Sequence, residues 1–191
     1  MISTRNLALS SAFALVLAAA ASANATLFDV YAQANSSSGG TGLATVALTA
    51  GQSFSVSVNP NDLWNAGPLP RWSNADGLIV NLYATGTDDS LQPVGTHIGT
   101  PFSLHTQNSF TAPYGALVGQ IGGSYILLGT SFTGFAPASG TLNLFYWDSN
   151  KGDNSEKITA NVTTNVPDAG STGLLLGGAV LALGALRRFV R

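Results

Sequence analysis

Residues 44–58 read ATVALTAGQSFSVSV, and this stretch sets the fold class of the chain. In its first half, Ala44, Val46 and Leu48 alternate with small or polar residues, and in its second half apolar residues alternate with serines. An alternation with a period of two is typical of a β-strand with one buried and one solvated face. A short turn at residues 50–52 separates the two runs, so the stretch predicts a β-hairpin.

Short runs of the same kind recur along the middle of the chain, at residues 78–82, 142–146 and 158–162. Residues 125–128 form an apolar run that suits a central strand. No segment of the middle shows helical periodicity, and several short strands separated by turns predict an all-β fold, an antiparallel β-sandwich. Eight apolar residues are expected to form its core: Val46, Leu48, Phe54, Val56, Leu142, Leu144, Ile158 and Val162.

The composition fits an exported, β-rich module better than a helical cytoplasmic enzyme. Only 8% of the 191 residues are charged, and small polar residues are abundant. The chain has no Cys, which excludes disulfide bonds and thiol chemistry. Residues 26–165 carry three basic residues against eight acidic ones, which argues against nucleic-acid binding because such binding depends on a basic surface.

The first 25 residues have the features of a secretory signal peptide. Arg5 gives the positive start, residues 7–21 are apolar, and Ala23-Asn24-Ala25 fits the small-x-small rule for cleavage. We therefore expect export of the protein and a mature chain that begins at Thr26.

The C-terminal end, residues 166–191, combines a short motif with an apolar run at residues 173–186 and a closing cluster of arginines. A hydrophobic helix followed by basic residues is typical of a membrane span with its basic end in the cytoplasm. We therefore expect a short transmembrane helix here.

This end of the chain resembles the PEP-CTERM sorting tails, in their Val-Pro-Asp-x-Gly variant. The resemblance implies recognition and removal of the tail by an exosortase-type membrane enzyme, in cells that produce exopolysaccharide. The protein would then be anchored in the membrane only until the tail is removed, and a permanent C-terminal anchor is the alternative. The residues that carry the resemblance are Val166, Pro167, Asp168, Gly170, Arg187 and Arg188.

A polar loop follows the alternating run at residues 142–146. Asp148, Asp153 and Asn154 place three oxygen-bearing side chains within seven residues, and Gly152 lets the backbone curl so that they can converge. Calcium ions (Ca2+) prefer such a cage of oxygen ligands. An ordinary solvated turn has the same composition, so the loop alone leaves both interpretations open.

Several short segments of the middle occur in an order shared with one family of lectins. They are Thr41-Gly42-Leu43, Trp64-Asn65-Ala66-Gly67-Pro68, residues 115–122, residues 139–144, and Asp148 with Asp153-Asn154-Ser155. In this order they resemble the galactose-binding, calcium-dependent bacterial lectins of the PA-I (LecA-like) type. The resemblance covers most of residues 26–165 and implies a small jelly-roll-like sandwich. One calcium ion would lie at its edge, with two sugar hydroxyls completing the shell of the ion.

The resemblance also implies a role for individual residues. The calcium ligands would be the side chains of Asp148, Asp153 and Asn154, the carbonyl of Ala66, and a carbonyl near Asn150. The sugar contacts would come from Asp148, Asn154, His105 and Gln107.

Three positions depart from the lectin pattern. Ala66 stands where the lectins often carry an aromatic residue, Trp147 stands where they usually carry Asn, and Glu156 stands where they usually carry Gly. The first departure removes one surface on which a sugar could stack.

Other classes of function leave weaker signals in the sequence. A hydrolase would need His97 or His105 beside a nucleophile, and the chain has neither a Gly-x-Ser-x-Gly elbow nor a His-Glu-x-x-His motif. A glycosidase with two carboxylates is defined by geometry and stays open. We predict a non-enzymatic carbohydrate-binding protein of the cell surface or exopolysaccharide matrix. The alternative is a structural matrix protein with a vestigial metal loop.

Overall fold

The structure, a computed structural model, describes residues 22–166, and of these residues 23–165 form one compact unit. The sequence before residue 22 and the predicted sorting tail after residue 166 lie outside the described residues. Strand β1 begins at Ser22, so it includes the last four residues of the predicted signal peptide. Within the described residues, no helix is long and apolar enough to cross a membrane.

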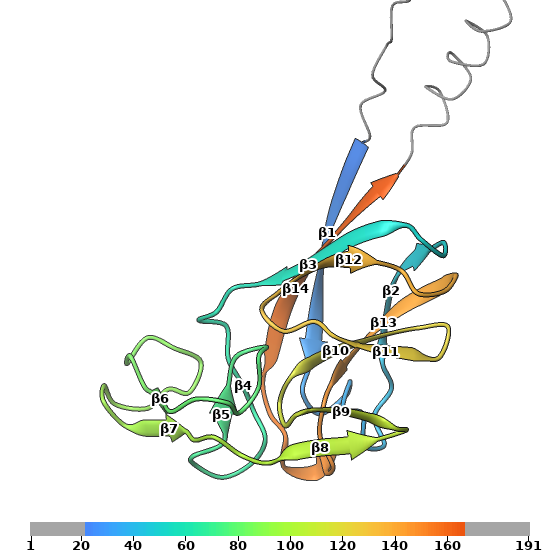
Figure 1. Cartoon of the computed structure of the whole chain (residues 1–191). Helices are drawn as coiled ribbons and strands as arrows, with labels where there is room; N and C mark the ends of the chain where they lie inside the picture. Colours follow the sequence, from blue (N-terminus) through green and yellow to red (C-terminus); the bar gives the residue numbers. More distant parts are fainter. Residues whose placement is uncertain (1–21, 167–191) are drawn as a thin grey trace, which may run out of the picture. The chain divides into compact units, whose positions relative to one another are not determined.

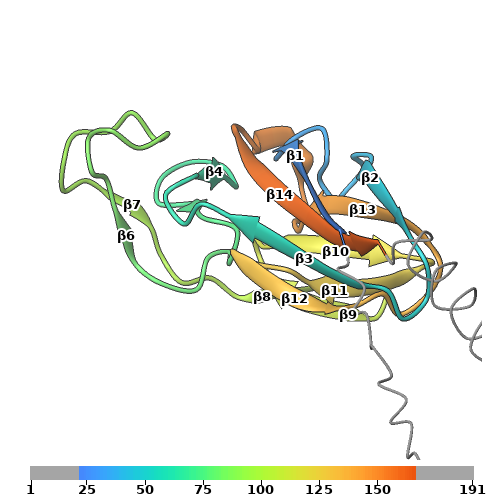
Figure 2. The same ribbon diagram turned by 90° about the horizontal axis from the view of Figure 1, so that it is seen from above.

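Eight strands form two four-stranded sheets, shown from two directions in Figures 1 and 2. The first sheet has the spatial order β1 (Ser22–Tyr31), β14 (Lys157–Val166), β3 (Ser53–Val58) and β12 (Ser131–Phe135). The second has the order β11 (Ser124–Leu127), β10 (Leu117–Ile121), β13 (Gly140–Tyr146) and β2 (Leu43–Leu48). The pairing is antiparallel along β14–β3–β12 and along the whole second sheet, which confirms the predicted all-β, antiparallel sandwich.

One hydrophobic cluster joins the two sheets and forms the core. It contains Phe54 and Val56 of β3 together with Leu142 and Leu144 of β13. Seven of the eight predicted core residues are buried in this cluster, and the eighth, Val46, is half-buried and packs against it.

The exposure of Val46 follows from an irregularity in β2. The register between β2 and β13 shifts between Thr141 and Asn143, so two residues of β2 lie opposite Leu142. The hydroxyl of Thr45 donates to the Leu142 carbonyl over 2.7 Å at this point. An extra residue in a strand reverses the alternation of faces, and the sequence pattern does not show it.

The predicted hairpin at residues 44–58 is wrong in its pairing, although both of its strands exist. β2 pairs with β13 and β3 pairs with β12 and β14, so the turn between them carries the chain from one sheet to the other. The amide of Gly51 donates to the carbonyl of Ala136 over 2.9 Å and ties this turn to the end of β12. An alternating run identifies the buried face of a strand but not its partner.

Two smaller expectations are also corrected. The alternating run at residues 78–82 forms a bend, with Val80 exposed, and only its end belongs to a short strand. Residues 125–127 of the predicted apolar run lie in β11, which is an edge strand of the second sheet and not a central one.

Three two-stranded ladders connect the main strands and shape the edge of the unit. They are β4 (Trp64–Asn65) with β5 (Trp72–Ser73), β6 (Leu82–Tyr83) with β7 (His97–Gly99), and β8 (Leu104–Gln107) with β9 (Phe110–Pro113). A 3-10 turn, η1 (Lys151–Asp153), lies in the polar loop between β13 and β14. Both Figure 1 and Figure 2 show β6 and β7 to one side of the two sheets.

Candidate functional site

The loop that carries Ala66 and the loop at residues 148–156 lie against each other. The backbones of Asn65 and Ser155 exchange two hydrogen bonds of 3.0 and 3.1 Å. A Cβ placed on Gly67 would lie 2.6 Å from a carboxylate oxygen of Asp153, so only a glycine allows this approach. The structure therefore brings together two segments of the predicted calcium site that are far apart in the sequence.

The tryptophans of the first loop act as packing residues. Trp64 is fully buried, and its ring meets the edge of Tyr146 with centroids 4.4 Å apart. Its indole N–H donates to the carbonyl of Gly115 over 2.8 Å. Trp72 is also buried and belongs to a separate small cluster with Leu63. These contacts fix the backbone on both sides of Ala66.

Asp148 is a buried carboxylate at the start of the second loop, with 4% of its surface exposed. Its Oδ2 accepts the amide of Asn150 over 3.2 Å, and its own amide donates to the hydroxyl of Ser37 over 3.0 Å. Burial raises the pKa of Asp148 above its usual value, although hydrogen bonds from the Asn154 side chain and from nearby amides oppose the rise. A carboxylate in such a place gains from a nearby cation.

Asn154 presents an oxygen that lacks a partner. Its side-chain amide donates to the carbonyl of Ala32 over 3.2 Å, while its Oδ1 is buried and accepts no hydrogen bond from the described residues. A buried acceptor without a partner costs about 1–3 kcal/mol, so a bound cation at this oxygen would stabilise the loop.

The remaining two predicted ligands, Asn150 and Asp153, lie in the same loop and are hydrogen-bonded to each other. The side-chain amide of Asn150 donates to Oδ1 of Asp153 over 2.9 Å, and its oxygen accepts the amide of Gly152 over 3.1 Å. Within residues 22–166, no group of three or more His, Cys, Asp or Glu side chains could hold a metal ion. A cation here would therefore depend on amide and carbonyl oxygens as well as on the carboxylates of Asp148 and Asp153.

The predicted sugar contacts His105 and Gln107 lie on β8, and Gln107 is linked to the same loop through Ser37. The side-chain amide of Gln107 donates to the carbonyl of Ser37 over 2.9 Å, and the hydroxyl of Ser37 donates to the carbonyl of Asp148 over 2.9 Å. The Nε2 of His105 and the Oε1 of Gln107 are buried and lack partners among the described residues.

Aromatic residues that the sequence analysis did not single out continue this edge. The hydroxyl of Tyr114 bonds to the Ser149 side chain over 3.1 Å, and its ring lies 5.0 Å from the ring of His105. The edge of Phe102 meets Tyr114 with centroids 5.2 Å apart, and the guanidinium of Arg71 lies 5.0 Å above Phe102. Both aromatic residues follow a proline directly, which gave a turn signal but no sign of a site.

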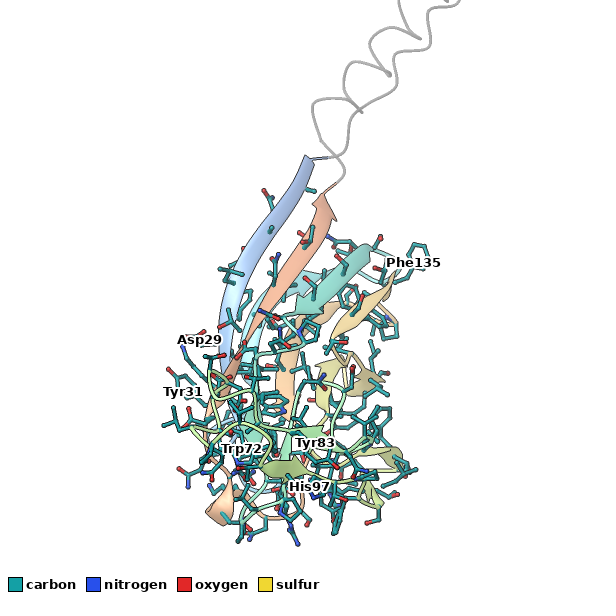
Figure 3. The ribbon with its side chains drawn as sticks, turned by 90° about the vertical axis from the view of Figure 1, so that its left-hand side faces the viewer. Asp29, Tyr31, Trp72, Tyr83, His97 and Phe135 are labelled. Atoms are coloured by element: carbon teal, nitrogen blue, oxygen red, sulfur yellow. The ribbon has the colours of Figure 1, made fainter. Side chains whose placement is uncertain are left out.

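His97 lies in different surroundings. Its ring is 5.1 Å from that of Tyr83, and both side chains are labelled in Figure 3. His105, by contrast, contacts the rings of Tyr114 and Trp147.

A pocket of about 490 Å³ lies away from the predicted site residues and is lined in part by Asp62 and Asp89. Each carboxylate accepts a backbone amide, Asp62 from Thr159 over 2.6 Å and Asp89 from Leu63 over 2.8 Å. Burial raises the pKa of Asp62, and the charge of Asp89 adds to this rise. The two carboxylates thus hold neighbouring loops in place.

Comparisons with known proteins support the reading of the C-terminal end. Residues 165–188 match the family model described as the VPDSG-CTERM motif. No curated protein matches the chain. A solved structure described as "EclA N-terminal domain; PllA-like lectin" is similar, with a TM-score of 0.45 and 21% identity over 73% of this chain and 95% of that one. The chain thus ends in a VPDSG-CTERM sorting motif, mostly beyond the described residues.

Proposed function

We propose that the protein is an exported carbohydrate-binding protein that holds a glycan through one calcium ion at its edge. The observation that carries the proposal is the buried Asp148 carboxylate together with the unpartnered Oδ1 of Asn154, in a loop packed against the Ala66 segment. Such a pair of oxygens is costly to bury alone and favourable to bury around a cation.

The donor set fits calcium by its chemistry. Asp148 and Asp153 offer carboxylates, Asn154 offers an amide oxygen, and the segments of Ala66 and Asn150 offer backbone carbonyls. Calcium accepts six to eight such oxygens in flexible geometry. With only two formal charges in the set, the affinity should be weak, with a Kd on the order of 10⁻⁴ to 10⁻³ M, as in extracellular modules.

The calcium ion would supply the orientation of the sugar, because vicinal hydroxyls can replace water on the ion. The chain's own residues supply the rest of the recognition. His105 and Gln107 bring buried polar atoms without partners, which can bond to sugar hydroxyls. The ring of Tyr114, next to His105, offers a face for the apolar side of the sugar and replaces the aromatic residue missing at position 66.

The sorting motif supports export and processing at the cell envelope. An exosortase-type enzyme would recognise Val166-Pro167-Asp168 and Gly170, remove the tail, and release the protein to the surface or the exopolysaccharide. The predicted membrane helix and the arginines at positions 187 and 188 would hold the chain in the membrane until then.

A structural matrix protein remains the second candidate, because the described residues contain no group of three charged or imidazole ligands.

Two experiments separate the candidates. Calcium should raise the Tm of the purified protein relative to calcium-free buffer, since a ligand that binds only the folded state stabilises it. Binding to a glycan array should depend on calcium. Identical Tm values with and without millimolar calcium would contradict the proposed metal site and favour the structural matrix protein. Hydrolysis of any arrayed glycan would favour an enzyme instead.

A further inference from the structure

Arg71 differs from the other basic residues of the domain. Residues 22–166 contain three basic side chains, and two of them have fixed partners: Lys157 pairs with Asp29, and Lys151 donates to the carbonyl of Gly39. The Arg71 side chain makes no ion pair and no hydrogen bond within this part of the chain. None of the eight acidic side chains present neutralises it.

The guanidinium of Arg71 is nevertheless held in place. It lies 5.0 Å from the centre of the Phe102 ring, a distance at which a cation is attracted to an aromatic face. Stacking on a ring leaves the planar set of N–H donors at the rim of the group available. A guanidinium held in this way loses little freedom when it binds a carboxylate.

Arg71 also lies at the edge of the proposed calcium site. Its carbonyl accepts the amide of Ala66 over 3.0 Å, directly across the small β4–β5 ladder.

A line of contacts connects Arg71 to the opposite side of the site. Phe102, which is 44% exposed, meets the half-buried Tyr114, and the hydroxyl of Tyr114 bonds to Ser149, the residue after Asp148. A cation, two aromatic rings and the oxygen-rich loop therefore follow one another along a single edge.

We propose that this edge selects acidic glycans, with Arg71 binding the carboxylate of a uronic acid residue while the calcium loop holds sugar hydroxyls. The inference rests on the proposed function and names its class of ligand. A guanidinium matches a carboxylate with two parallel hydrogen bonds, and Phe102 and Tyr114 provide the ring surface between the two ends. Because the domain is acidic overall, the unpaired charge of Arg71 favours a negatively charged sugar that the acidic residues would otherwise repel.

The test uses the purified full-length protein and pairs of oligosaccharides. Each pair consists of a uronic acid trisaccharide and its carboxyl-reduced, neutral counterpart, made from galacturonate, glucuronate and mannuronate. With calcium present, the wild type should bind the acidic member of at least one pair about tenfold more tightly than the neutral member. This preference should decrease as the salt concentration rises.

Arg71→Gln should abolish the preference while calcium-dependent binding of the neutral member remains. Arg71→Lys should keep part of the preference, since a lysine keeps the charge but not the planar donors. Lys157→Gln is the matched control, because it removes the same charge from β14, where Lys157 pairs with Asp29, a residue labelled in Figure 3. This control should bind as the wild type does, and the Tm of each variant reports its folding.

The outcomes separate this inference from the proposed function. Equal binding of both members by the wild type, or an acidic preference that survives Arg71→Gln, overturns the role of Arg71 and leaves the calcium-dependent site standing. Absence of binding to every member of every pair, with and without calcium, overturns this inference, while the proposed function is decided by the calcium melts and the glycan array.

Discussion

Two acidic loops of this protein have similar compositions, but the pKa values of their aspartates Asp88 and Asp148 are shifted in opposite directions. In the loop at residues 85–90, the carboxylate of Asp88 accepts hydrogen bonds from the amides and hydroxyls of Thr85 and Ser90. The small burial of Asp88 acts to raise its pKa, but these hydrogen bonds outweigh it and lower the pKa to about 2. The carboxylate is thus satisfied by its own turn.

Asp148 in the loop at residues 148–156 shows the reverse. Burial raises its pKa despite the hydrogen bonds that it receives, and the neighbouring charge of Asp153 adds to the rise. A few residues further along the chain, Asn154 keeps an oxygen without a partner. The difference indicates that an Asp-rich turn becomes a candidate cation site when some of its side-chain oxygens receive no hydrogen bonds from the turn itself. That property is not visible in composition.

Among the substitutions that test this comparison, Asp148→Ala should have the largest effect. It should abolish both the calcium-induced increase in Tm and calcium-dependent glycan binding, because it removes the buried carboxylate of the proposed site. Asp88→Ala is the control and should retain both responses while lowering the Tm in all buffers. Thermal melts and glycan binding of the two variants give the answer. A calcium response that survives in Asp148→Ala, or disappears in Asp88→Ala, would contradict the proposal that calcium binds at the loop of Asp148 and not at the loop of Asp88.

The pH dependence of stability should also separate the two loops. Without calcium, the raised pKa of Asp148 means that its ionisation destabilises the fold, so its contribution becomes more favourable as pH falls through that raised pKa. With calcium, the ionised form binds, so the calcium-induced increase in Tm should shrink over the same range. Asp88 contributes stability that is present above pH ~4 and is lost as pH falls toward 2. Melts from pH 7 to 3, with and without calcium, measure these trends. A calcium response that is constant down to pH 3 would contradict the role of Asp148.

Asp153→Asn should have an intermediate effect. The substitution keeps an oxygen at the site but removes one of two formal charges, so the Kd for calcium should increase by roughly tenfold while binding remains measurable. Titration calorimetry, or the calcium dependence of the Tm, measures the change. An unchanged Kd would show that Asp153 only accepts the hydrogen bond from Asn150.

The smallest expected effect concerns Glu156, which closes the loop in a left-handed conformation with φ 68°. A residue with a Cβ pays about 1 kcal/mol or more for this conformation, and glycine pays nothing for it in the folded state. Glu156→Gly should therefore raise the Tm by about 3 °C or less, with calcium binding unchanged. A lower Tm would mean that the glutamate side chain has a stabilising role that outweighs the backbone strain.

Much of the fold could be predicted because alternation reports burial directly. The runs at residues 53–58 and 158–162 became β3 and part of β14, with their apolar faces in the core. The pairing of β2 could not be predicted, because a turn between two alternating runs can close a hairpin or cross between sheets. The bulge in β2 was hidden for the same reason, since it depends on the partner strand β13.

The candidate site, like the fold, could be predicted only in part from the sequence. The loop at residues 148–156 is continuous in sequence and could be recognised from its oxygen-bearing residues. The meeting of this loop with Ala66, and the link from Gln107 through Ser37 to Asp148, depend on contacts between distant segments. Arg71 and Phe102 left no periodic pattern, because their importance comes from a contact between side chains across two loops.

Strand β14 has a mechanical consequence for the proposed function. It begins at Lys157, directly after the candidate site, and its ten extended residues up to Val166 span about 30 Å. β14 also lies between β1 and β3 in its sheet (Figure 1). A pull between a bound glycan and a tail held in the membrane would act along this strand. Its hydrogen bonds to the neighbouring strands would then be loaded together in shear instead of being opened one after another.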